Sequence, residues 1–371
     1  MDLGFLAPVY AVSGPFATAY LDTTSAVEGA AARIAARWRA RREELAAAGA
    51  DDATLDAMAE AAGRDHGDGE AQVLVGAGGR LLLDVRLPDQ PRRETASWGP
   101  LPDVLPMVSA LADVVPYVLV VADRAGADIT AYGDHGDTAA ERHVQGGTFD
   151  IRKVKPGDWA AKKYQQRAEN LWQTNAKQVA GQVAGLAQQV RARIIVAAGD
   201  VRALGYLRES LPLPAAQILH EVSEGGRGAG ASTASLGEHV RRLVAEVAVR
   251  DAMEVLAEFE QERGQHDRAV EGLGHTAAAL RRAQVQTVVL GADTDDGATL
   301  CIGADPSQVA VSAQDLQDLG VEEITSAPAT AAILRAAVAT GADLVLVPGG
   351  DRPLADGVGA VLRYADAATP A

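Results

Sequence analysis

The feature that most constrains this chain is a long helical pattern in its middle, between residues 158 and 190. Apolar side chains recur there at every third or fourth position, the spacing that places them on one face of a helix packed against a core. These residues are Tyr164, Ala168, Leu171 or Trp172, Ala176, Val179, Val183, Leu186 and Val190. Pro156 precedes the pattern, and Asp158 is the expected N-cap. The pattern therefore predicts one long helix with a buried face.

The same region carries a charge opposite to that of the chain. Residues 152–193 contain nine Lys or Arg and two acidic residues, whereas the whole chain has a net charge of −16. Such a reversal favours a polyanionic partner that meets this segment. The candidate RNA-binding residues are Arg152, Lys153, Lys155, Lys162, Lys163, Arg167 and Lys177. A solvated helix with ordinary surface lysines is the alternative, and the charge alone leaves it open.

A second group of cations lies in the first hundred residues. Five arginines crowd one expected helix: Arg33, Arg37, Arg39, Arg41 and Arg42. Glu28, Glu43 and Glu44 lie nearby in the sequence and offset part of that charge. We therefore expect this helix to present a solvated face and not a second basic interface.

Composition and motifs argue against several classes of protein. Cys301 is the single cysteine, so neither an intrachain disulfide nor a cysteine-rich zinc site is expected. The first Lys or Arg is Arg33, and no apolar run approaches the length of a membrane span, so we expect a cytoplasmic protein without a membrane partner. The sequence has no Gly-Lys-Ser or Gly-Lys-Thr, and its seven histidines are dispersed. We expect neither a cofactor nor a metal, and attribute Asp293, Asp295 and Asp296 to a turn.

The order of strand and helix patterns predicts an α/β protein of three domains, at residues 1-110, 111-230 and 231-371. In the first, we expect a strand at 16–21, helices at 25–48 and 51–62, and a hairpin of two strands at 71–75 and 80–86. A proline-rich linker at 88–106 follows. In the second, we expect strands at 117–122, 128–132, 193–197 and 217–222. We expect a loop at 133–147 and, besides the long helix, a short helix at 201–210. A Gly-rich hinge at 225–230 ends this domain. The third begins with a long helix from Ser235 and continues with patterns at 276–290, 299–302, 330–347 and 360–364.

Four stretches, in this order and spacing, resemble a known family. They are YVLVVADRAGADITAYG from Tyr117, GGTFDIRKVKPGDWAAKKYQQRAEN from Gly146, VEGLGHTAAALRRAQVQTVVL from Val270 and LADGVGAVLRY from Leu354. The chain resembles the bacterial relatives of the archaeo-eukaryotic release factors, kin to Pelota and to ribosome hibernation factors of the Balon kind. The resemblance implies a first domain directed at the decoding centre and a ribonuclease-H-like middle domain directed at the peptidyl transferase centre. It also implies a last domain like the kink-turn-binding ribosomal proteins.

In true release factors, the glutamine of a Gly-Gly-Gln loop positions the water that hydrolyses peptidyl-tRNA. Gly146 and Gly147 match the two glycines, but Thr148 stands in the third position, and Gln145 precedes the glycines. The resemblance therefore gives Gln145, Gly146 and Gly147 as the only candidates for a catalytic loop. Binding through the basic helix needs phosphate contacts alone and does not depend on that loop.

Three functions follow as hypotheses. The first is a non-catalytic hibernation factor that occupies the ribosomal A site, contacts rRNA of the A site and peptidyl transferase centre, and acts in the stress response. The second is an enzyme, a peptidyl-tRNA hydrolase or rescue factor acting on stalled ribosomes. The third is an α/β protein that binds another RNA, or a protein partner, through the same helix. Elongation factor Tu as a delivering partner is implied by the resemblance alone, and no DNA partner is expected.

Overall fold

The computed structural model describes most of the chain, namely residues 1–24, 29–64, 70–87, 89–91, 93–134, 136–147, 158–223, 233–265, 267–291, 297–347 and 354–366. Of residues 158–165, 168, 233 and 234 it describes the backbone only. The chain forms two compact units, one made of Met1–Ala112 with Asp251–Ala371 and the other of Asp113–Arg250. The predicted division into three domains places its second boundary after residue 230, whereas the units divide after Arg250, and it stays a prediction.

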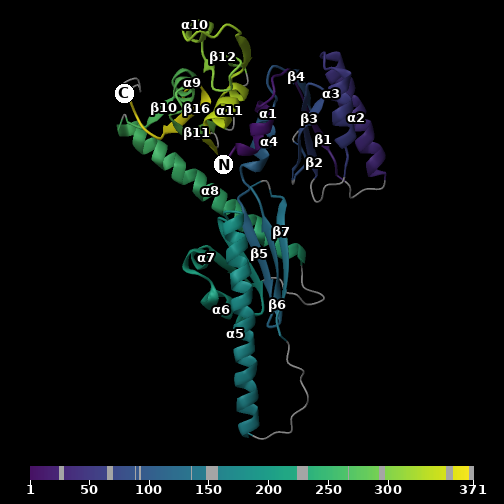
Figure 1. Ribbon diagram of the computed structural model, residues 1–371, viewed down its shortest axis with the longest axis vertical. Coiled ribbons are helices and arrows are strands. Elements are labelled where there is room, and N and C mark those ends of the chain that lie inside the picture. Colours follow the sequence, from purple (N-terminus) through teal and green to yellow (C-terminus); the bar gives the residue numbers. More distant parts are fainter. Residues whose placement is uncertain are drawn as a thin grey trace. The chain divides into compact units, whose positions relative to one another are not determined.

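The first unit contains a four-stranded antiparallel sheet near the start of the chain (Figure 1), with the strand order β3-β2-β1-β4. Its strands are β1 (Phe16–Asp22), β2 (Ala71–Ala77), β3 (Arg80–Leu87) and β4 (Ala96–Gly99). Helices α2 (Ala30–Ala47) and α3 (Asp52–Ala61) pack on one face of this sheet. Asp51 caps α3 by accepting a hydrogen bond from the Thr54 backbone amide at 2.9 Å. The predicted strands, helices and hairpin are confirmed.

The proline-rich segment 88–106 is not only a linker, as the sequence had suggested. It contains β4, which pairs with β1 so that Trp98 lies opposite Ala17. Pro91 and Pro100 flank this strand and do not interrupt it. Since proline excludes a strand only at the position it occupies, a four-residue strand fits between the prolines.

The two ends of the chain share one core in the first unit. The short helices η1 (Gly4–Leu6) and α1 (Ala7–Tyr10), with α4 (Leu105–Leu111), contribute buried residues to the same cluster as the C-terminal elements. Leu6 and Val9 are fully buried there, as is Leu334 of α11 (Ala329–Thr340). The Leu344 amide also donates to the Met1 carbonyl at 3.0 Å. This shared core explains why residues 1–112 and 251–371 form one unit.

The C-terminal part of this unit has a second sheet, of order β10-β16-β11-β15, in which only β11 and β15 are parallel. A three-stranded sheet of order β13-β12-β14 adjoins it in the sequence. The elements are β10 (Ala269–Glu271), α9 (Leu273–Arg281), β11 (Val285–Gly291), β12 (Thr299–Ile302), β13 (Val309–Ala310), α10 (Ala313–Gln317), β14 (Thr325–Pro328), β15 (Asp343–Val347), η2 (Ala355–Gly357) and β16 (Val358–Leu362). The final strand ends at Leu362 and not at Tyr364, as the sequence had suggested.

The second unit is built on a five-stranded mixed sheet, of order β7-β6-β5-β8-β9. Its strands are β5 (Tyr117–Ala122), β6 (Gly126–Tyr132), β7 (Thr138–Gln145), β8 (Ile194–Gly199) and β9 (Leu219–Val222). β5, β6 and β7 pair antiparallel, whereas β8 runs parallel to β5 and to β9. This order and these directions are those of a ribonuclease-H-like sheet. The predicted mixed α/β class is confirmed.

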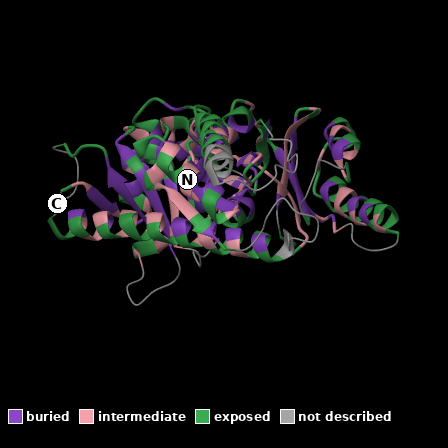
Figure 2. Cartoon of the chain, turned by 90° about the horizontal axis from the view of Figure 1, so that it is seen from below, coloured by how far each residue is buried: buried purple, intermediate pink, exposed green. Residues whose placement is uncertain are grey.

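Helices cover both faces of this sheet. On one face, α5 (Asp158–Gln189), α6 (Val201–Ser210) and α7 (Leu213–Gln217) share a core with the strands. On the other face, the first half of α8 (Thr233–Gln265) buries Leu236, Val240, Val244 and Val247 against β8. In Figure 2, buried residues are frequent in the strands of the chain, and the helices expose their outer sides. The predicted hinge at 225–230 lies outside the described residues.

Two predictions for the second unit were wrong. Residues 133–147 were expected to form a loop, but β7 occupies 138–145 and pairs with β6. β7 is an edge strand, and Val144 is its only buried residue, so its sequence lacks the apolar alternation that marks a strand. Asp158 was expected as the N-cap, but α5 begins at Asp158 itself.

No described helix combines the length and apolar composition needed to cross a membrane.

We expect Gly126→Ala to disrupt the pairing of β6 with β7, because a Cβ at Gly126 would lie 1.9 Å from the Val144 carbonyl oxygen. The expected loss of unfolding free energy is roughly 3 kcal/mol or more. Gly181→Ala is the control, because Gly181 lies within α5 and no atom comes within 4 Å of the position that a Cβ would take there. That change should stabilise the helix by about 1 kcal/mol. Urea unfolding with hydrogen exchange of the β6 and β7 amides measures both, and equal effects would contradict the prediction.

Candidate nucleic-acid interface

The two halves of α5 have different surroundings. With 32 residues, the helix is about 48 Å long at 1.5 Å per residue. Among its described side chains, the buried ones begin at Asn175 and end at Ala187, whereas those from Gln166 to Thr174 are exposed or half-buried. Figure 1 shows the beginning of α5 extending past the strands of its own sheet. The first half of the helix is therefore a projection without a core of its own.

Two of the predicted RNA-binding residues are described with their side chains, Arg167 and Lys177. Both are exposed, and neither forms an ion pair with any residue that the structure describes. They lie ten positions apart, which corresponds to about 15 Å along the helix axis. Glu169, between them, is exposed as well. Arg167 and Lys177 are thus cations available to a partner.

The other predicted residues are less fully placed. Lys162 and Lys163 lie in the first turns of α5, where only the backbone is described. Arg152, Lys153 and Lys155 lie outside the described residues. The RNA-binding assignment of all seven residues stays a prediction.

The arginines of α2 provide a contrast. Arg37 pairs with Asp22 at 2.7 Å and with Glu94 at 3.1 Å. Arg42 pairs with Asp56 at 2.9 Å, and Arg41 with Glu44 at 2.6 Å. Carboxylates on the same helix and on neighbouring elements therefore offset the charge of these three side chains, which supports the expectation that α2 is not a basic interface.

The Gly-Gly pair lies at the end of the sheet, beside the second half of α5. The Gly146 amide donates to the Ala125 carbonyl at 2.7 Å. Asn175 bonds both backbone groups of Gly147, accepting from its amide at 3.2 Å and donating to its carbonyl at 3.2 Å. Asn175 lies 17 residues into α5, or about 26 Å from the helix start. Gln145 is exposed at the end of β7, and Thr148 lies outside the described residues.

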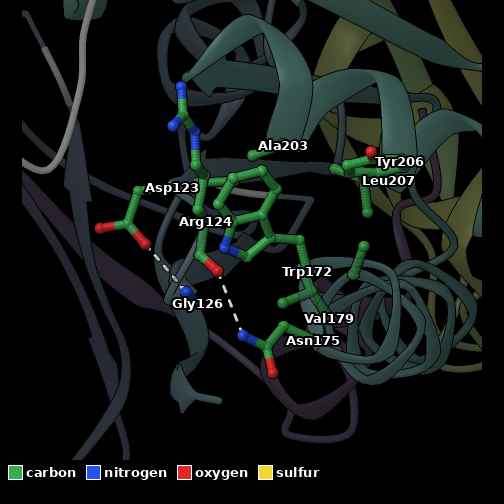
Figure 3. Close-up of a pocket in the computed structure, with 11 residues that line it drawn as sticks. Asp123, Arg124, Gly126, Trp172, Asn175, Val179, Ala203, Tyr206 and Leu207 are labelled. Atoms are coloured by element: carbon green, nitrogen blue, oxygen red, sulfur yellow. Dashed lines mark hydrogen bonds between the residues drawn. The ribbon is translucent and has the colours of Figure 1, made fainter. Parts of the chain in front are cut away.

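Arg124 connects the turn between β5 and β6 to two helices, in a shallow recess (Figure 3). Its guanidinium lies over the Trp172 ring of α5, 5.0 Å from the ring centroid. It also donates two hydrogen bonds to Asp200, at 3.0 and 3.2 Å. The Arg124 carbonyl accepts a bond from Asn175 at 3.1 Å.

Asp200 serves α6 as well. Its carboxylate accepts from the backbone amides of Arg202 and Ala203, both at 3.1 Å, and so caps the helix. The hydrogen bond from Arg124, followed by the bonds from these amides, lowers the pKa of Asp200. The same pair raises the pKa of Arg124. The charges of Arg124 and Asp200 therefore compensate each other within the fold.

Sequence reasoning did not identify Arg124, Asn175 or Asp200. Asn175 could have been noticed in the sequence as a polar residue next to Ala176 of the apolar stripe. Arg124 and Asp200 gave no signal, because their partners lie 76 positions away in the sequence. Among the described residues, no three His, Cys, Asp or Glu side chains gather in a way that could hold a metal ion.

We expect Asp200→Ala to remove the cap of α6 and lower its stability by about 0.5–2 kcal/mol. Because the pKa of Asp200 is lowered, its contribution is present above the ordinary Asp pKa of about 3.9 and is lost as the pH falls through the folded value. Asp200→Asn retains a capping oxygen and should show less of this pH dependence. Hydrogen exchange of the α6 amides between pH 3 and 7 provides the measurement. Identical pH profiles for Asn and Asp would refute the account.

The comparisons with known proteins identify relatives of the chain. Residues 116–265 match the model of bacterial archaeo-eukaryotic release factor family 2. Two proteins of Mycobacterium tuberculosis, Rv2629 of strain H37Rv and MT2704 of strain CDC 1551, are each 29% identical over 365 residues. In both cases the match spans 96% of this chain and 95% of the relative.

Among solved structures, the chain is similar to the archaeal translation termination factor aRF1, at 14% identity and a TM-score of 0.29. That match covers 98% of this chain and 99% of the other. A model of ribosome-bound archaeal Pelota and ABCE1 matches at 13% identity and a TM-score of 0.39, covering 98% and 94%.

The family match spans the mixed sheet, α5 and the whole of α8. Over these residues, the chain is similar to the bacterial archaeo-eukaryotic release factors of family 2.

Proposed function

We propose that this protein is a ribosome-binding translation factor that contacts rRNA through the exposed face of α5, and that it acts as a non-catalytic hibernation factor in the A site. The match of residues 116–265 to the model of a release factor family supports the first part. The observation that carries the binding mode is the exposure of Arg167 and Lys177, without ion pairs to described residues, on a helix that projects from its sheet.

The distribution of charge over the surface decides where a nucleic acid can bind. The chain has a net charge of −16, so its average field repels nucleic acid. Binding then requires a local surface on which cations outnumber carboxylates, and α5 offers one. Lys and Arg that contact phosphates release condensed counterions, which makes such binding strong at low salt and weak at high salt.

The non-catalytic part of the proposal has two supports. Thr148 replaces the glutamine that positions water in the release factors that this chain resembles. The Gly147 amide and carbonyl are both bonded to Asn175. Backbone groups that are engaged inside the fold are not free to bind a reacting ester.

Three finer parts of the proposal come from the resemblance. The rRNA contacts are those of the A site and the peptidyl transferase centre, the protein acts in the cytoplasm under stress, and elongation factor Tu delivers it. Sedimentation with idle 70S ribosomes, with and without elongation factor Tu and GTP, tests delivery. Equal occupancy in both samples would remove elongation factor Tu from the proposal.

For the interface, we expect Arg167→Ala and Lys177→Ala each to reduce the slope of log affinity against log salt by about one. Co-sedimentation with 70S ribosomes over a series of salt concentrations measures this slope. Arg42→Ala is the matched control, because Arg42 already pairs with Asp52 and Asp56. The interface is wrong if the Arg42 variant lowers the slope as much as the two α5 variants.

Charge reversal gives a stronger test. Changing Lys162, Lys163 and Arg167 together to Glu replaces three positive charges by three negative ones on the first turns of α5. We expect this variant to fold, because no described residue of that half is buried, and to lose ribosome binding at roughly physiological salt. Circular dichroism checks the fold. Retention of binding by a folded triple variant would exclude this face of α5 as the interface.

For catalysis, we expect no release of labelled peptide from stalled ribosome complexes above the rate without protein. A release factor of known activity on the same complexes serves as the positive control. Release that Gly147→Ala abolishes would instead assign the protein to the rescue enzymes.

A further inference from the structure

Asn175 is a polar residue buried within the apolar stripe of α5, with 4% of its surface exposed. Its carboxamide has one acceptor and one amino group with two donors, and the structure uses all of them. Oδ1 accepts from the Gly147 amide, and Nδ2 donates to the carbonyls of Gly147 and Arg124, at distances of 3.1 to 3.2 Å. A buried polar group that loses a hydrogen bond costs free energy, so the three hydrogen bonds hold the Asn175 side chain in this position.

The glycines explain how the backbone comes so close to the helix. A Cβ on Gly146 would lie 2.1 Å from Oδ1 of Asn175, so the Asn175 side chain would have to move away. A Cβ on Gly147 would lie 3.0 Å from Cδ1 of Leu171. The close approach to α5 therefore favours glycine at position 146 independently of any chemistry in a loop, whereas at position 147 the Leu171 side chain would have to give only slightly.

The β5–β6 turn, which Asn175 binds through the Arg124 carbonyl, has further contacts with α5 and α6. Arg124 offers its carbonyl to Asn175, while its guanidinium stacks on Trp172 and binds Asp200. Trp172 and Asn175 are three positions apart on α5 and so share a face of the helix. One helix thus holds both the β5–β6 turn and the end of β7.

We propose that Asn175 is a positioning residue that fixes the chain at Gly147, where it leaves the sheet, and that Gly146 and Gly147 serve as partners of Asn175 and not as catalytic groups. The positioning fixes the end of β7 relative to the helix that carries Arg167 and Lys177. Only the ribosome-binding readout below rests on the proposed function.

A double-mutant cycle tests the close approach of Gly146 to Asn175. Gly146→Ala in the full chain should raise the exchange rate of the Gly147 amide at least about tenfold, because it pushes the Asn175 side chain away. Asn175→Ala should have a similar effect. In the Asn175→Ala background, Gly146→Ala should add less than about twofold, because the clashing oxygen is gone. Gly181→Ala, on the same helix in open space, is the control and should change nothing at Gly147.

A pH profile separates hydrogen bonding from packing. Asn175→Asp preserves the shape, but its carboxylate donates no bond and faces the carbonyls of Gly147 and Arg124, which should raise its pKa. Asp123 and Arg124 line the same recess, and Asp200 of α6 binds Arg124. Wild type measured in parallel corrects for these groups. Protection of the Gly147 amide in the variant should approach that of wild type as the pH falls and the carboxyl regains a proton to donate.

Ribosome binding supplies the functional readout. Asn175→Ala should weaken co-sedimentation about tenfold without changing the salt slope, because it removes no cation. Two results overturn the proposal: additive effects of Gly146→Ala and Asn175→Ala on exchange, or full protection of the Gly147 amide in Asn175→Ala. If wild type fails to bind ribosomes while the cycle behaves as expected, the proposed function fails and the positioning role stands.

Discussion

The burial of the second half of α5 against the mixed sheet is the interaction on which the proposed interface depends. Val179, Val183 and Leu186 lie in one core with Val120 and Ile195 of the strands. Each such side chain contributes about 1.5–3 kcal/mol when fully buried. This half therefore anchors the helix, and the same regular hydrogen bonding carries the first half beyond the sheet. A basic surface on that half needs no core of its own.

The distribution of ion pairs gives this projection its chemical character. Several arginines outside α5 meet carboxylates at short distances, as Arg263 does with Glu260 and Glu271, and as Arg268 does with Glu262. Such pairs at the surface contribute little to stability, but they cancel the local positive field. On α5, Arg167 and Lys177 have no such described partner. The acidic protein thereby keeps, on α5, positive charge that no described carboxylate pairs with.

Much of the fold could be predicted because apolar periodicity is a local signal. The strands at Phe16 and Tyr117 and the long helix follow from it. β7 was missed because an edge strand exposes most of its side chains, and β4 was missed because prolines flank it. Backbone pairing with another strand decides both cases, β1 for β4 and β6 for β7, and the local apolar pattern does not contain that information.

The candidate site divides in the same way. The positive charges of α5 can be read directly from the sequence, and the structure describes Arg167 and Lys177 as exposed. The roles of Asn175 and Arg124 depend on contacts 28 to 76 positions away in the sequence. The match of Gly146 and Gly147 to a catalytic motif does not predict their contact with Asn175, because Asn175 lies far from them in the sequence.

The central claim is that the exposed face of α5 lies against ribosomal RNA. Asn170 is exposed on this face, between Arg167 and Lys177. A photoreactive amino acid placed there, with a second variant labelled at the exposed Asp52 of the other unit as reference, allows crosslinking on 70S ribosomes. The account predicts that position 170 crosslinks to rRNA of the large subunit far more than position 52 does. Crosslinks from position 170 to protein alone, or to no ribosomal component, would contradict it.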